Sequence, residues 1–234
     1  MPAMAADARA TPTARMSAAF TPERLGAPTT VSFAFRVHDG GGPPAPLAGI
    51  QLSYPRGLGL ATSGLGVAAC TQSELEVSGP AACPPNSHMG TGSALVELRI
   101  GPTLVHETVT LTLLAGPSPD GYLHLLVYAL GELPVYAAVV LTAVLLPEHL
   151  SIVVPPIPSL PEAPYVSLAQ MHLTVGGHLT YYETVNGRQV PYHPAGIGVP
   201  NSCPHAGFPF AAHFSFLDGA RASARTAVAC PRHR

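Results

Sequence analysis

The chain has 234 residues, which suits one large all-β domain or two small ones and is long enough to bury a sizeable core. Only 10% of the residues are charged and 47% are hydrophobic, which excludes general disorder and indicates a compact fold or an apolar interface. All 11 basic residues are arginines, no basic run occurs and the net charge is −2, so a nucleic-acid partner is not expected.

The N-terminal part is expected to be irregular. Residues 1–19 are rich in Ala, Thr and Pro and are predicted to form a disordered leader or the remnant of a signal peptide. Order is expected to begin near Phe20. The segment 31–37 alternates apolar with small or polar residues, which is typical of a half-buried strand. The Gly-rich segment 58–70 is expected to be irregular.

The middle of the chain is predicted to be a succession of strands separated by Gly- and Pro-containing turns. These strands are expected at 50–54, 93–100, 108–114, 122–130, 135–146 and 150–154. Because no apolar run approaches the about 20 residues that a membrane-spanning helix needs, no transmembrane segment is predicted.

Residues 155–164 contain five prolines in ten residues, a composition that favours extended polyproline geometry. This segment is predicted to be either a crossover between sheets or a linker between domains. The remaining segment 165–234 would then complete the sandwich or form a small second domain. Its strands are expected at 165–175, 178–185, 188–192 and in a hairpin around Asp218-Gly219.

The predicted fold is therefore all-β, with about ten to twelve strands and no convincing helix. We expect an immunoglobulin-like β-sandwich, built as one large unit or as two intimately packed units, with its core in residues 20–154. The tryptophan of antibody domains is absent, so a true antibody-type domain is not expected.

The four cysteines, Cys70, Cys83, Cys203 and Cys230, allow three pairings. Folding the last hairpin about Asp218-Gly219 brings Cys230 back near Cys203, which predicts a Cys203–Cys230 bridge and leaves Cys70–Cys83 as the second. Two disulfides indicate an oxidising compartment.

A metal site is the alternative use of the C-terminal cysteines. Cys203 and Cys230 with His205 and His233 have zinc-ligand chemistry, but their spacing matches no finger pattern and leaves the other two cysteines unexplained. We therefore predict no metal and no cofactor.

No catalytic motif is present, so no catalytic residue is predicted. Glycines at 57–59 and 90–92 are expected to serve in turns, not in a phosphate loop. Four aromatic and histidine side chains near one hairpin are candidates for a sugar- or peptide-binding surface, in competition with ordinary packing. They are His178, Tyr181, Tyr182 and His193.

Three segments together carry a resemblance: FTPERLGAPTT at 20–30, CPPNSHMG at 83–90 and CPHAGFPF at 203–210. From about residue 20 onward the chain resembles a group of uncharacterised secreted β-rich proteins from GC-rich actinobacteria. The resemblance implies export and a two-disulfide β fold, but no activity and no site residues, since the group has no assigned function.

These observations predict an exported, non-catalytic protein of the cell envelope or extracellular space, with a structural or interaction role and a protein or envelope component as its partner. Two alternatives stay open. One is a carrier of an apolar ligand held between sheets, which the apolar region 135–154 suggests. The other is a secreted hydrolase whose site is assembled from loops.

Overall fold

The structure is a computed structural model that describes residues 11–40, 42–61, 67–100, 102–133, 136–157, 165–176, 180–193 and 196–231. Antiparallel strands dominate these residues, which confirms the predicted all-β class. In chain order the strands are β1 (Thr13–Thr21), β2 (Pro28–His38), β3 (Leu47–Ser53), β4 (Gly59–Ala61), β5 (His88–Ile100), β6 (Thr103–Ala115), β7 (Leu123–Gly131), β8 (Ala137–Leu145), β9 (His149–Val153), β10 (Ser167–Val175), β11 (Tyr181–Val185), β12 (Arg188–Tyr192), β13 (Gly196–Gly198), β14 (Phe208–Phe216) and β15 (Arg221–Val228).

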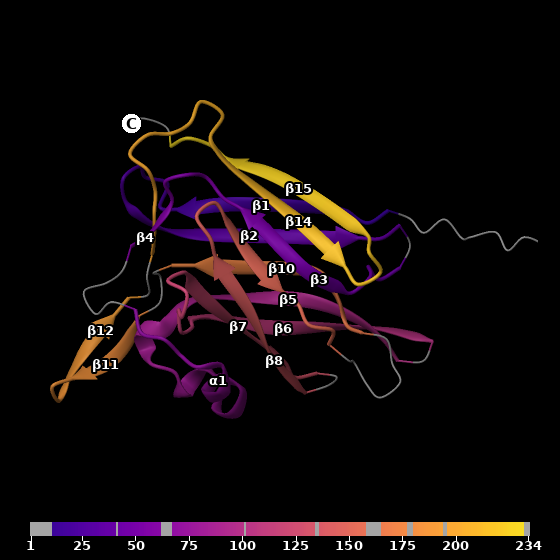
Figure 1. Cartoon of the computed structure of the whole chain (residues 1–234), viewed down its shortest axis with the longest axis horizontal. Coiled ribbons are helices and arrows are strands. Elements are labelled where there is room, and N and C mark those ends of the chain that lie inside the picture. Colours follow the sequence, from indigo (N-terminus) through magenta and orange to yellow (C-terminus); the bar gives the residue numbers. More distant parts are fainter. Residues whose placement is uncertain are drawn as a thin grey trace, which may run out of the picture.

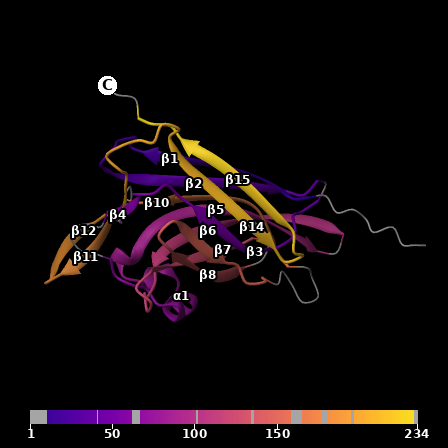
Figure 2. The same cartoon turned by 45° about the horizontal axis from the view of Figure 1, so that its top comes forward.

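One curled sheet of 13 strands contains all of these except the separate hairpin β11–β12. Its order is β15-β14-β3-β9-β8-β7-β6-β5-β10-β2-β13-β4, with β1 paired to β2. The sheet curls until β1 lies beside β15, so that strands far apart in the hydrogen-bonded order face one another (Figures 1 and 2). The apolar faces of the strands meet inside this curl.

The immunoglobulin-like sandwich is not confirmed, and the strand count within the described ranges is higher than predicted. The additional strands are β1, which lies in the segment predicted to be a leader, and β4 and β13, which have only three residues each and so cannot show a period of two. A single sheet that curls encloses a core in the same way as two stacked sheets, so the alternation of apolar residues does not distinguish the two architectures.

The prediction of a disordered leader over 1–19 is wrong for residues 13–19, because β1 begins at Thr13 and pairs with β2 over its whole length. Its even-numbered residues Met16, Ala18 and Phe20 join the interior clusters. Order therefore begins well before Phe20. Residues 1–10 lie outside the described residues.

A helix, α1 (Gln72–Ser78), interrupts the strands, so the expectation of no helix is wrong. Its start is fixed by a capping box: the Thr71 hydroxyl accepts from the Glu74 N–H at 3.2 Å, and the Glu74 carboxylate accepts from the Thr71 N–H at 3.1 Å. The Thr71 hydroxyl, which donates to the Glu74 carboxylate at 2.8 Å, and the Thr71 N–H together hold the pKa of Glu74 below its usual range. The helix ends at Gly79, whose positive φ of 72° terminates it.

The strands after the Pro-rich segment belong to the same sheet as those before it. Strand β10 pairs with β2 and β5, and β14 pairs with β3. These pairings join strands from both sides of the Pro-rich segment in one sheet. Most of the Pro-rich segment, residues 158–164, lies outside the described residues.

The prediction that Gly90 and Gly92 serve in turns is wrong, because both lie inside a strand. Gly90 and Gly92 lie within β5, and a Cβ on either would overlap a backbone carbonyl of β10, at Thr174 and His172 respectively. These positions therefore require glycine for the close approach of two strands.

Candidate ligand-binding site

One wall of the interior is built from β3, β7, β8, β9 and β14. Because paired residues of an antiparallel sheet point to the same face, the register aligns apolar side chains in rows. One row runs from Leu125 through Ala143, Ile152 and Ile50 to Phe214. The next row runs from Leu123 through Leu145, Leu150 and Leu52 to Ala212.

The opposite wall comes from β2 and β10, where Phe35 pairs with Met171 and Phe33 with Leu173. Aromatic contacts join the two walls: the ring centroids of Phe35 and Phe214 are 4.9 Å apart, and those of Phe33 and Phe210 are 5.4 Å apart. These contacts join β2 to β14 across the interior.

Between the walls the packing leaves a cavity of about 140 Å³. Its lining combines the residues of these rows other than Phe214 with Met16, Met89 and Met171, and is apolar apart from the backbone and the hydroxyl of Tyr54. Apolar cavities of about 150 Å³ stay dry and accept a molecule the size of benzene. Methionine side chains adapt to irregular shapes, so three of them give the lining room to adjust.

The cavity residues Leu123, Leu145 and Leu150 lie at strand ends, next to the turns of one sheet edge. Here the Tyr54 hydroxyl donates to the carbonyl of Leu146, and the Tyr54 N–H donates to the carbonyl of Glu148 at 3.3 Å. Burial and the negative charge of Glu148 raise the pKa of Tyr54. The β3–β4 loop is thus fastened to the β8–β9 turn beside the cavity.

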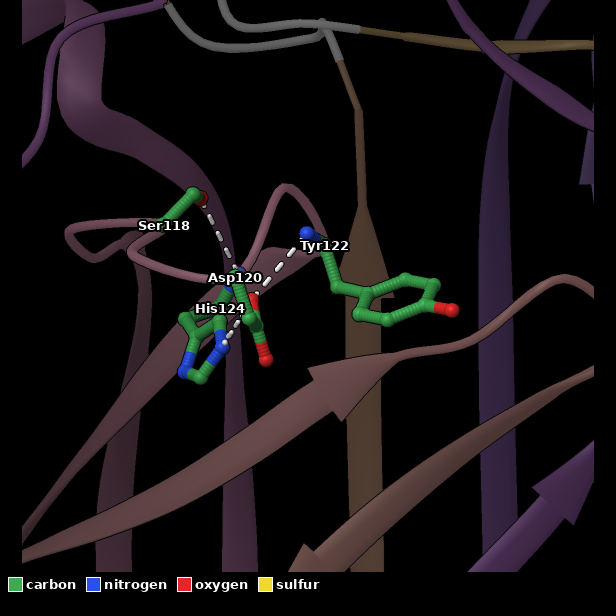
Figure 3. A network of polar contacts seen from close by, with 4 residues as sticks. All are labelled: Ser118, Asp120, Tyr122 and His124. Carbon is green, nitrogen blue, oxygen red and sulfur yellow. Dashed lines mark hydrogen bonds and ion pairs between the residues drawn. The ribbon is translucent and has the colours of Figure 1, made fainter.

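The β6–β7 turn at this edge holds the described residues that most resemble a catalytic triad: Ser118, Asp120 and His124 (Figure 3). The His124 Nε2 lies 2.9 Å from Asp120 Oδ1, but the Ser118 hydroxyl accepts from the backbone N–H of His124, at 3.5 Å. Burial raises the pKa of Asp120, whereas the Tyr122 N–H and His124 lower it, with a net decrease. The three side chains therefore brace their own turn, and the hydroxyl does not meet the imidazole.

The predicted surface residues of the β11–β12 hairpin do not gather at one point. Tyr181 packs on His88, with ring centroids 4.7 Å apart, whereas Tyr182 on the opposite face of β11 is exposed. His193 Nδ1 lies 3.3 Å from the Thr180 hydroxyl. His178 lies outside the described residues. A binding role for this hairpin stays a prediction.

Tyr181 has a structural partner that sequence reasoning missed. Burial lowers the pKa of His88, although a backbone contact with Pro80 opposes this effect, and the buried His88 Nδ1 has no hydrogen-bond partner among the described residues. Burial also raises the pKa of Tyr181. The hairpin is therefore attached to the sheet by packing between these two rings.

Both predicted disulfides are confirmed. Cys70 and Cys83 have Cα atoms 5.2 Å apart, and those of Cys203 and Cys230 are 5.8 Å apart. Since Cys203 and Cys230 bond to each other, the alternative of a zinc site on these two sulfurs is wrong. Over the described ranges, no group of three or more His, Cys, Asp or Glu side chains is arranged to hold a metal ion.

Within the described part of the chain, no helix has both the length and the hydropathy needed to cross a membrane. Comparison with protein-family models, with curated proteins and with solved structures found no match to this chain. The resemblance to secreted actinobacterial proteins therefore stays a prediction.

Proposed function

We propose that the chain is an exported, non-catalytic binding protein for a small apolar molecule. The observation that carries this proposal is the cavity of about 140 Å³ lined by apolar side chains from both walls of the curled sheet. An unfilled space in a core costs packing energy, roughly 24 cal/mol for each Å³. A fold that retains such a space gains stability when an apolar molecule occupies it.

The size of the cavity sets the class of ligand. Pockets for drug-sized molecules usually span about 300–1,000 Å³. The present cavity suits a single aromatic ring or a short alkyl group. Its lining offers few hydrogen-bonding groups, so we expect binding to follow shape and apolarity rather than polar recognition.

Two buried alanines provide a matched test. Ala143 lines the cavity, whereas Ala224 lies in another core cluster. We expect toluene to raise the thermal midpoint of the wild-type protein and of Ala224→Leu. In Ala143→Leu the larger side chain fills the space, so the affinity for toluene should fall at least about tenfold. An unchanged affinity in Ala143→Leu, or no toluene binding by the wild type, would contradict the proposal.

Export is supported by the two disulfides, which persist in oxidising compartments. It is tested separately, by mass spectrometry of the native protein from its host before and after reduction. Free thiols in that protein would contradict export and leave the ligand-binding proposal standing.

A further inference from the structure

The outer face of the sheet has a second hollow, distinct from the interior cavity. A groove of about 600 Å³ lies across β1, β2, β10, β5 and β6. In one row of the register, Arg15 of β1 lies opposite Arg36 of β2, which lies opposite Gln170 of β10. In the next row Ala34 lies opposite His172, which lies opposite Ser93 of β5.

Two arginines directly opposite each other are unusual on a solvent-exposed surface that binds no ligand. Directly opposed residues on neighbouring strands have Cβ atoms about 5 Å apart, and like charges in that position are destabilising. No described carboxylate lies within ion-pair distance of Arg15 or Arg36, and none lines the groove. The nearest acid on this face of β5, Glu97, is paired with His106 at 3.3 Å.

Both arginines line the groove, where a ligand could reach them. Arg36 donates from Nη2 to the Gln170 Oε1 at 2.9 Å, which fixes its side chain and leaves its other N–H donors free for a ligand. The groove adds further donors from side chains on the same face. These are His38, His172, Ser17, Ser93 and Thr108.

We propose that this groove binds an oxyanion, a phosphate or sulfate group carried by a ligand, between Arg15 and Arg36. Arginine forks match the oxygens of such groups and form charge-assisted hydrogen bonds with them. A bound anion would neutralise the opposed charges, so the same contact that destabilises the free protein would stabilise the complex. The site is independent of the interior cavity.

The test uses inorganic pyrophosphate and dextran sulfate as probes, measured by calorimetry at low ionic strength with the full chain. We expect at least one probe to bind and its affinity to fall with added salt. Arg15→Gln and Arg36→Gln should each weaken binding about tenfold or more, because each removes charge-assisted hydrogen bonds. Tighter binding of pyrophosphate would indicate a small phosphate-bearing ligand, and tighter binding of dextran sulfate an anionic polymer.

Two further variants separate binding from folding. Arg188→Gln changes an arginine of the β11–β12 hairpin and should bind as the wild type does. Gln170→Glu keeps both arginines but places a carboxylate beside Arg36, and should weaken binding as much as loss of the arginine. Equal binding by Arg15→Gln, Gln170→Glu and Arg188→Gln, or failure of both probes to bind the wild type, would overturn the proposal.

Discussion

Two regions of the outer face of the same sheet differ in their exposure to solvent. One is covered by another segment of the chain, and the other is open. Over β6 and β7 the outward side chains Leu114, Leu126 and Tyr128 are buried beneath Leu75 of α1 and the Cys70–Cys83 bridge. Over β2, β5 and β10 the outward side chains that line the open groove are mostly polar, with Ala34 and Leu95 as exceptions. Figure 1 shows α1 against the first region, on the side of the molecule away from β1 and β15.

The difference follows from the sequence of each strand. Residues 113–115 of β6 and 125–130 of β7 are apolar at consecutive positions, so both faces of these two segments need apolar neighbours, as in strands covered on two sides. In β2 buried and less buried residues alternate, with Val31, Phe35 and Val37 turned to the core. The segment that contains α1 and the Cys70–Cys83 bridge is therefore part of the core. The groove, by contrast, is open to solvent and can bind a ligand.

The largest expected effect comes from breaking the Cys70–Cys83 bridge, which together with α1 covers the outer face of β6 and β7. We call α1 and this bridge the cover. Replacing Cys70 and Cys83 together by Ala should lower the free energy of unfolding by about 3 kcal/mol through loop entropy, with a further loss because both sulfurs are buried. Urea unfolding measures this change. An apolar dye should then bind the uncovered strands.

The second bridge is the control for that experiment. Replacing Cys203 and Cys230 by Ala opens a loop of similar entropic cost, about 3.5 kcal/mol, but uncovers no part of the outer face. Equal dye binding by the two double variants would show that the Cys70–Cys83 bridge does not hold a cover in place.

A smaller change tests the packing of the cover itself. Leu75 is fully buried in α1, and Leu75→Ala should cost about 3 kcal/mol. Val77 on the same helix is 86% exposed, so Val77→Ala should change the stability by less than about 0.5 kcal/mol. Similar losses for the two variants would mean that α1 does not pack as described.

Local sequence was enough to predict the features that depend on neighbours in the chain. The strand at 31–37 was predicted from alternation, and the strand at 108–114 from the turn residues around it. The turn at Asp218-Gly219 also gave the Cys203–Cys230 bridge. Two errors were avoidable. The alternation of Met16, Ala18 and Phe20 was masked by an Ala-rich composition, and Thr71 with Glu74 has the spacing of a capping box.

The apolar region 135–154 suggested a carrier of an apolar ligand, and it supplies part of the cavity lining. The full set of residues in either candidate site could not be predicted, because both sites depend on pairing between strands far apart in the chain. The cavity needs β3 between β9 and β14, and the groove needs β10 between β2 and β5. Nothing in one sequence states that Arg36 faces both Arg15 and Gln170. Curling of the sheet adds a further long-range constraint, since it brings β1 beside β15.

The smallest expected effect concerns an acidic side chain that lies on the core side of the sheet and not on its outer face. Glu107 of β6 lies in the same alternating set as Val109 and Leu111, and it is buried, with an exposed fraction of 6%. Its Oε1 has no hydrogen-bond partner among the described residues, and burial raises the pKa of its carboxyl. Ionisation of this carboxyl is therefore disfavoured in the folded state. Its contribution to the free energy of unfolding is fully present below its unfolded pKa and is lost as the pH rises through its folded pKa.

Glu107→Gln should therefore raise the free energy of unfolding by about 1 kcal/mol at pH 7, because an unpaired charge no longer has to be buried. At about pH 4, where the native carboxyl is already protonated, the gain should largely disappear. The matched control is Glu97→Gln on the outer face of β5, which loses only its ion pair with the exposed His106 and should not gain stability at either pH. Urea unfolding at the two pH values measures all three proteins. A stabilisation by Glu107→Gln that is equal at both pH values would show that the charge of Glu107 is not its cause, and would assign the effect to packing instead.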